Sequence, residues 1–320
     1  MRIEYPMSEN NVPHWGVWEM IREILQNAID AGGIECSYEN GQLTISNEGQ
    51  MDRRVLLLGE SQKNTGAIGQ FGEGMKLAML VAARLKRIIK VYSGTERWIP
   101  SMQHSETFHS QVFCIDTEEV ENDGITVILE VSESEWLDAK SKWIDNPTGM
   151  LKDIEAGTMF VGGLYVCKLD GFEYAYNFDP NNVRLNRDRD IPRLFDLQWE
   201  TTRLLRDPER VLDLAIAGKK DILSFSADSE TLASAWDAVH GDTVPIGVSE
   251  QDSIHASDRR IIPDWVAMAI RSVRNFIFRS EGTPFERLKS WREKYRYGLT
   301  TPQLVELDRI IEDLNHEETK

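Results

Sequence analysis

Two short segments decide the expected fold: Glu19-Met20-Ile21-Arg22-Glu23-Ile24-Leu25-Gln26-Asn27-Ala28-Ile29-Asp30-Ala31 and Gly69-Gln70-Phe71-Gly72-Glu73-Gly74-Met75-Lys76. The first has the period of a helix, because its apolar residues recur every three or four positions. Its polar residues recur at the same spacing on the opposite face: Glu19, Glu23, Asn27 and Asp30. The segment predicts either a helix that presents a stripe of oxygen ligands or a surface helix with a solvated acidic face.

The second segment places three glycines, with the spacing G-x-x-G-x-G, before a helical pattern that runs from Met75 to Leu85. Glycines allow backbone N–H groups to approach an anion closely, and a helix N-terminus adds partial positive charge. Lys76 places a formal positive charge in the first turn, where a cation is unfavourable unless an anion lies nearby. The pattern predicts a phosphate site, and a structural tight turn is the alternative.

Four ordered motifs resemble the GHKL superfamily of gyrase-type topoisomerases, heat-shock chaperones, histidine kinases, MutL and MORC proteins. The motifs are Glu23-x-x-x-Asn27-x-x-Asp30-Ala31, Ile45-Ser46-Asn47-Glu48-Gly49, Gly69-Gln70-Phe71-Gly72-Glu73-Gly74 and Gly124-Ile125-Thr126-Val127. The resemblance covers roughly residues 15–131. It implies an α+β, Bergerat-type sandwich in which helices cover a mixed sheet, followed by a second, transducer-like α/β domain. The expected boundaries are 1–148 for the ATP-binding domain, 149–260 for the second domain and 261–320 for a helical C-terminal segment.

The resemblance also implies a set of roles in a site for ATP and Mg²⁺. Glu23 would be the general base, and Asn27 would ligate Mg²⁺ with Asp30 in support. The phosphates would be held by Gly69, Gln70, Phe71, Gly72, Glu73, Gly74 and Lys76. Lys63 lies in the expected ATP lid, for which an ordinary exposed loop is the alternative. An arginine of the second domain, Arg187 (or Arg184 or Arg189), would reach the γ-phosphate, and the alternative is a loop in which Arg187 and Arg189 pair with neighbouring aspartates. The adenine base of ATP would be held by Asn47, Gly49 and Thr126.

Position 47 departs from the family pattern, which has aspartate there to accept a hydrogen bond from the adenine amine. The amide oxygen of Asn47 can still accept such a bond, but without a charge. This departure keeps open a second interpretation, in which the protein is a nucleotide-binding regulatory module that scarcely hydrolyses ATP.

The composition limits the classes of partner. The chain has 320 residues, 41% of them hydrophobic, and a formal net charge of −17. Such acidity argues against a broad nucleic-acid or membrane surface, although a local basic patch stays possible. The three cysteines lie far apart and predict free thiols in a reducing compartment. With no apparent signal peptide or membrane span, we expect a cytoplasmic protein.

Outside the motifs, the sequence predicts the following elements. Residues 1–14 are polar and suggest an arm. Asn40-Gly41 and Asp170-Gly171 predict hairpin turns. Strands are expected at 34–38, 42–46, 88–93, 111–115, 125–131, 158–168, 172–178 and 243–248, whereas residues 94–110 carry little signal. Helices are expected at 136–143, 191–206, 208–216, 229–239, 262–278, 284–296 and 301–314.

The expected function is ATP hydrolysis that drives a conformational change or dimer clamp, in a chaperone-like manner, on a protein client or DNA-processing partner. Histidine kinase activity is disfavoured because His14, in a short segment beside Pro13, is the lone histidine before the first motif. The length leaves no room for a topoisomerase cleavage domain, and the acidity disfavours a MutL-type DNA channel. A phage or mobile-element protein that acts on a host system is a further alternative.

Overall fold

The computed structural model describes most of the chain, which forms two compact units, Met1–Leu204 and Leu205–Lys320. The described residues are 1–49, 51, 53–56, 73–145, 147–186, 193–252, 254, 256, 258–276, 288–289, 291–292 and 299–318. The first unit contains two sheets, and the boundary expected near residue 148 falls between them. That boundary stays a prediction.

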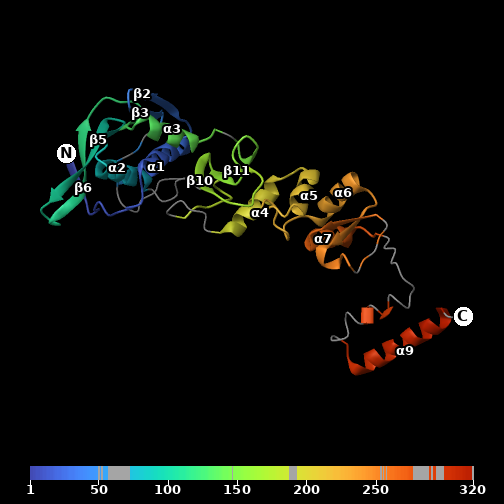
Figure 1. Ribbon diagram of the computed structural model, residues 1–320. Coiled ribbons are helices and arrows are strands. Elements are labelled where there is room, and N and C mark those ends of the chain that lie inside the picture. Colours follow the sequence, from blue (N-terminus) through green and yellow to red (C-terminus); the bar gives the residue numbers. More distant parts are fainter. Residues whose placement is uncertain are drawn as a thin grey trace. The chain divides into compact units, whose positions relative to one another are not determined.

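The first unit is built on a seven-stranded sheet with the order β1-β6-β5-β4-β7-β3-β2, of which Figure 1 labels β2, β3, β5 and β6. Every neighbouring pair is antiparallel, whereas the family resemblance had implied a mixed sheet. The strands are β1 (Arg2–Tyr5), β2 (Glu35–Glu39), β3 (Gln42–Asn47), β4 (Ile89–Ser93), β5 (Glu96–Ser105), β6 (Ser110–Glu119) and β7 (Ile125–Glu130). The hairpin predicted at Asn40-Gly41 joins β2 to β3, and both turn residues have positive φ, as a tight hairpin requires.

Two helices, α1 (Val17–Asp30) and α2 (Gly74–Arg84), share one hydrophobic core with this sheet. Met20, Ile24 and Leu25 of α1 are almost fully buried, as is the run from Leu77 to Ala82 in α2. Burial of each large aliphatic side chain stabilises the fold by about 1.5–3 kcal/mol. The short 3₁₀ helix η1 (Arg53–Leu56) and helix α3 (Glu133–Ser141) complete this part of the unit.

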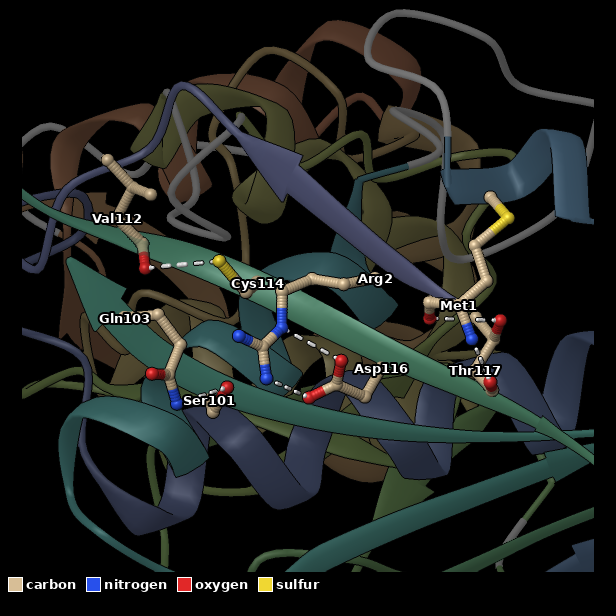
Figure 2. A network of polar contacts seen from close by, with 8 residues as sticks. All are labelled: Met1, Arg2, Ser101, Gln103, Val112, Cys114, Asp116 and Thr117. Carbon is tan, nitrogen blue, oxygen red and sulfur yellow. Dashed lines mark hydrogen bonds and ion pairs between the residues drawn. The ribbon is translucent and has the colours of Figure 1, made fainter. Parts of the chain in front are cut away.

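The N-terminal residues do not form the expected arm. Strand β1 pairs with β6 at the edge of the sheet, and Figure 2 shows Arg2 facing Asp116 across the two strands. The Nε and Nη2 atoms of Arg2 each lie 2.9 Å from a carboxylate oxygen of Asp116. Tyr5, Met7 and Trp15 are buried in the core. Three apolar anchors therefore hold a segment that its polar composition had suggested would be free.

Strand β5 lies in the stretch of weak sequence signal, where polar residues and Pro100 obscure the period of two. It pairs along its whole length with β6, and the partners run from Glu96 opposite Glu119 to Ser105 opposite Ser110. The pairing with β6, and not the local pattern, defines this strand.

The second sheet of the first unit has the order β10-β9-β11-β8. Its strands are β8 (Gly149–Leu151), β9 (Thr158–Val161), β10 (Leu164–Lys168) and β11 (Ala175–Phe178), and helix α4 (Leu194–Leu204) follows. The hairpin lies at Gly162-Gly163, which both have positive φ, and not at Asp170-Gly171. Strand β11 pairs in parallel with β9, so the Asp-Gly turn leads into a crossover rather than a hairpin.

The second unit contains helices α5 (Pro208–Ile216), α6 (Ser229–His240), α7 (Asp264–Val273) and α9 (Thr301–Glu318). Two short strands, β12 (Val244–Gly247) and β13 (Arg259–Ile262), pair in parallel, and the 3₁₀ helix η2 (Val248–Glu250) follows β12. Most of the helix predicted at 284–296 lies outside the described residues. Within the described part of the chain, no helix is both long and apolar enough to span a membrane.

The thiol of Cys36 reports on the packing of β2. Burial raises its pKa from 9.0 to about 11, although Lys140 acts in the opposite direction. We expect alkylation of Cys36 by iodoacetamide at pH 8 to be much slower than in the urea-unfolded chain, because the thiolate is the reactive form. The thiol pKa is 9.0 in the unfolded chain and about 11 in the folded chain, so the folded state binds the proton more tightly. The contribution of Cys36 to the free energy of unfolding is therefore fully present below pH 9.0 and lost as the pH rises to about 11. Peptide mass spectrometry measures the alkylation, and equal rates in the two states would contradict the placement.

Candidate functional site

The carboxylate of Glu23 lies between the guanidinium of Arg22, its neighbour on α1, and Gly74 at the start of α2. Its side chain is 1% exposed, and Oε1 accepts from Nη2 of Arg22 at 3.1 Å and from Nε at 3.3 Å. The other oxygen, Oε2, faces Gly74, since a Cβ atom added there would lie 2.3 Å from it. The structure therefore brings the acidic residue of the first motif against the glycine-containing helix start of the third.

Glycine at position 74 makes this close approach possible, because any side chain would collide with the carboxylate. Gly74 is the first residue of α2, and Glu73 precedes it as the N-cap. A carboxylate at a helix N-terminus is favourable, since the first N–H groups have no partners within the helix and carry partial positive charge. The same properties make this end of α2 suitable for a phosphate group.

Lys76 lies in the first turn of α2 and is 1% exposed. Burial lowers the pKa of its ammonium group, and the charge of Glu73 acts in the opposite direction. The residue predicted to contact phosphate is thus at the predicted end of the helix, but it is buried rather than extended into solvent.

Asn27 lies one turn after Glu23 on α1 and is half-buried. Its Nδ2 atom donates to the backbone carbonyl of Glu23 at 2.8 Å. A carbonyl can only accept, so the nitrogen must face it, and the amide oxygen is directed away from that carbonyl. An amide oxygen is a hard ligand of the type that Mg²⁺ prefers, so the residue fits the predicted role. Asp30, one turn further along α1, is also half-buried.

No group of three or more His, Cys, Asp or Glu residues that could hold a metal ion occurs within the described ranges.

Asn47 and Gly49 form a turn at the end of β3. The Oδ1 atom of Asn47 accepts from the backbone N–H of Gly49 at 2.8 Å. A Cβ atom on Gly49 would lie 3.3 Å from the Cβ of Ala31 and 3.5 Å from the Cδ1 of Ile125. The end of β3 therefore meets the end of α1 and the start of β7. One hydrogen bond of the Asn47 oxygen is already used in this turn, and a second lone pair remains.

Thr126 does not join this group. On β7 it lies opposite Ser46 and Tyr92, and its neighbours Ile125 and Val127 are both buried in the core shared with the helices. Successive side chains of a strand point to opposite faces, so Thr126 points away from the helices and Ile125 faces Gly49. The alternation of Ile125, Val127 and Leu129 in the sequence was the signal that could have indicated this.

Six predicted site residues lie outside the described residues: Lys63, Gly69, Gln70, Phe71, Gly72 and Arg187. Their roles stay predictions.

Three residues of the site region were not predicted from the sequence. Arg22 is 9% exposed and places its Cζ atom 5.2 Å from the ring centroid of Trp15, which is 4% exposed. Gln26 is 2% exposed, and its Nε2 atom has no hydrogen-bond partner among the residues that the structure describes. The helical period gave no reason to bury these polar side chains, because it cannot show how many neighbours surround a helix.

Two cavities in the first unit lie elsewhere. One of about 410 Å³ is lined by Asn40, Arg87, Lys90 and Glu130 among others, and one of about 340 Å³ by Gly32, Gly33, Trp143 and Gly163 among others. Neither is lined by Glu23, Asn27 or Asn47, so neither is the site assembled around Glu23.

No family model and no curated protein matches this chain. Among solved structures, it is similar to the ATPase region of Saccharomyces cerevisiae topoisomerase II bound to ICRF-187 (dexrazoxane), at 14% identity with a TM-score of 0.28 over 51% of this chain and 50% of that chain. The same region of the yeast enzyme in a second crystal structure gives 14% identity and a TM-score of 0.27, with 50% of each chain covered. The chain thus spans about half the length of the solved chains that it matches.

The contact between Glu23 and Gly74 is testable by a double-mutant cycle. We expect Gly74→Ala to lower the free energy of unfolding by about 1–3 kcal/mol, because the added methyl group displaces a buried, ion-paired carboxylate. In a Glu23→Ala background the same substitution is expected to cost nothing, since the colliding oxygen is gone. Urea unfolding measures the change in the free energy of unfolding in both backgrounds.

Gly33→Ala is the matched control, because nothing lies within 4 Å of a Cβ atom at that position. Equal losses from Gly74→Ala in both backgrounds would show that Glu23 does not face Gly74.

Proposed function

We propose that the protein binds ATP together with Mg²⁺ and hydrolyses it, in the manner of the GHKL ATPases that its motifs resemble. The observation that carries the proposal is the approach of the Glu23 carboxylate to Gly74 at the start of α2. A general base and a phosphate-binding helix end must share one site for hydrolysis, and these two groups come from separate motifs.

Glu23 is proposed as the general base that takes a proton from the attacking water. Two N–H groups of Arg22 hold Oε1, which leaves Oε2 on the side of α2 where a phosphate group would bind. A positioned carboxylate of this kind typically contributes a factor of about 10²–10⁴ to a rate.

The phosphates are proposed to bind at the N-terminus of α2, through backbone N–H groups of the glycine-rich segment that ends at Gly74 and through the charge of Lys76. The first N–H groups of a helix and its dipole favour an anion at this end of α2. Gly69, Gln70, Phe71, Gly72 and Glu73 belong to the same proposal, and Lys63 and Arg187 are proposed as further contacts to the phosphates.

Asn27 is proposed to hold Mg²⁺ through its amide oxygen, with Asp30 in support. When bound, this ion would neutralise charge on the phosphate oxygens. The proposal is supported by the hydrogen bond of Nδ2 to the carbonyl of Glu23, which directs the amide oxygen away from that carbonyl.

The adenine base of ATP is proposed to lie near Asn47 and Gly49. The turn between them holds the Asn47 side chain by a 2.8 Å hydrogen bond, so its amide group would be presented to an adenine base in one orientation. Thr126 is left out of this part of the proposal because its neighbours in the strand face the core.

ATP turnover is proposed to drive an ATP-dependent homodimer or conformational switch that acts on a protein client or a DNA-processing partner. The net charge of −17 favours a protein surface over direct binding to a nucleic-acid backbone.

A second candidate function is a nucleotide-binding regulatory module with little turnover. It is favoured by the burial of Glu23 and by its ion pair with Arg22, which alone would suit a structural carboxylate that stabilises the start of α2.

Replacement of Glu23 separates these two functions. We expect Glu23→Gln to lower the rate of phosphate release at saturating ATP and Mg²⁺ by at least about 100-fold, because an amide cannot accept the proton. Binding of a fluorescent non-hydrolysable ATP analogue is expected to change by no more than about threefold. Glu35→Gln on the edge strand β2 is the control, since that residue is exposed. Full hydrolysis by Glu23→Gln would contradict the assigned role, and binding without hydrolysis by the unaltered protein would favour the regulatory module.

The proposed dimer is tested by light scattering. We expect the mass in solution to rise from one chain to two on addition of a non-hydrolysable ATP analogue with Mg²⁺, because a ligand that favours the paired state shifts the equilibrium toward it. Glu23→Gln is expected to show the same rise with ATP itself, since it binds without turnover. An unchanged monomer mass, with the analogue shown to be bound, would contradict the clamp.

A further inference from the structure

A continuous set of contacts joins the N-terminal segment to the carboxylate of Glu23. The ring of Trp15 lies 5.2 Å from the Cζ atom of Arg22, and two nitrogens of Arg22 lie 3.1 and 3.3 Å from Oε1 of Glu23. Trp15, Arg22 and Glu23 are 4%, 9% and 1% exposed, respectively. Interactions of charge with charge and of a cation with an aromatic ring are strongest in such dry surroundings.

We infer that Arg22, held against Trp15, is a positioning residue that fixes the orientation of the Glu23 carboxylate, so that the N-terminal segment completes the site within its own chain. This inference rests on the proposed function of Glu23 as a base. Both N–H donors of Arg22 bind Oε1, and Oε2 is the oxygen turned toward Gly74. A carboxylate oxygen that is held by two donors of the same guanidinium restricts the rotation of the whole carboxylate.

The segment that carries Trp15 is itself held in place from α2. The Nη1 atom of Arg84 donates to the carbonyls of Glu9, Asn11 and Val12 at 3.3, 3.2 and 3.0 Å, and Nη2 donates to the carbonyl of Trp15. Val12 has φ of 47°, a left-handed conformation that is costly for a β-branched residue. Such a conformation persists where surrounding contacts stabilise it, and here Arg84 adds to the local hydrogen bond from the N–H of Trp15 to the carbonyl of Val12 at 3.0 Å.

A purely structural role for Arg22 makes a different prediction. If Arg22 only neutralises a buried charge, its replacement lowers stability and leaves the rate of the folded fraction unchanged. If it orients the base, its replacement lowers kcat while nucleotide affinity stays the same, because the interaction acts on the reacting geometry. Trp15 should then act through Arg22, so the two effects should not add.

The experiment measures kcat for phosphate release, the Kd of a fluorescent non-hydrolysable ATP analogue and the melting temperature in Arg22→Lys, Trp15→Leu and the double variant. We expect Arg22→Lys to lower kcat by about tenfold or more and Trp15→Leu by about threefold, each with Kd within about twofold of the unaltered protein. The double variant is expected to match Arg22→Lys alone. Arg22→Lys retains the positive charge, and Trp15→Leu retains the apolar character of the side chain. Trp15→Leu tests the inference even where Arg22→Lys does not fold.

The matched controls are Arg2→Lys, in an exposed ion pair, and Trp199→Leu, on the surface of α4, and neither should change kcat or Kd. Unchanged kcat in folded Arg22→Lys or folded Trp15→Leu would overturn the inference, as would additive losses in the double variant or a loss confined to Kd. The proposed function is judged separately, because it fails when the unaltered protein releases no phosphate or when Glu23→Gln releases it at the full rate.

Discussion

The buried carboxylate of Glu23 is the constraint on which the rest of the site depends. An ionised group removed from water is tolerated when it is paired and hydrogen-bonded, and loss of one partner of a buried pair costs about 3–5 kcal/mol. Arg22 supplies the charge, and the first turn of α2 supplies the favourable end of a helix. Once Glu23 is placed in this way, Gly74 has no room for a side chain, and α1 and α2 must meet at this point.

The sequence was most informative where local patterns and tertiary packing agree. The period of α1 and the Asn40-Gly41 hairpin were both predicted, and both depend on residues close together in the chain. Strand β5 was missed because its pairing with β6, and not its own alternation, defines it. The hairpin of the second sheet was predicted at Asp170-Gly171, but Gly162-Gly163 turn the chain first, and β11 returns in parallel with β9.

The site was predictable to the extent that it follows from motif order. The meeting of Glu23 with Gly74 fits the expected proximity of the first and third motifs. Thr126 was chosen for its residue type, but it is its strand neighbours, Ile125 and Val127, that face the core shared with α1 and α2. Arg22 and Trp15 could not have been found in this way. Their contact requires the N-terminal segment to fold back against α1, and that segment is held by Arg84, which lies 69 residues after Trp15 in the chain.

The docked N-terminal segment changes what a dimer would contribute. If a polar arm crossed to a partner, the formation of each site would depend on protein concentration, because the dimer would supply part of the site. Here β1 is paired within its own sheet, and Trp15 already contacts Arg22 of the same chain. The contacts from Trp15 through Arg22 to Glu23 therefore all lie within one chain, and a nucleotide-driven dimer would not be needed to supply them. Under the proposed function, dimerisation would then be a consequence of ATP binding, while the orientation of the Glu23 carboxylate would depend on the single folded chain.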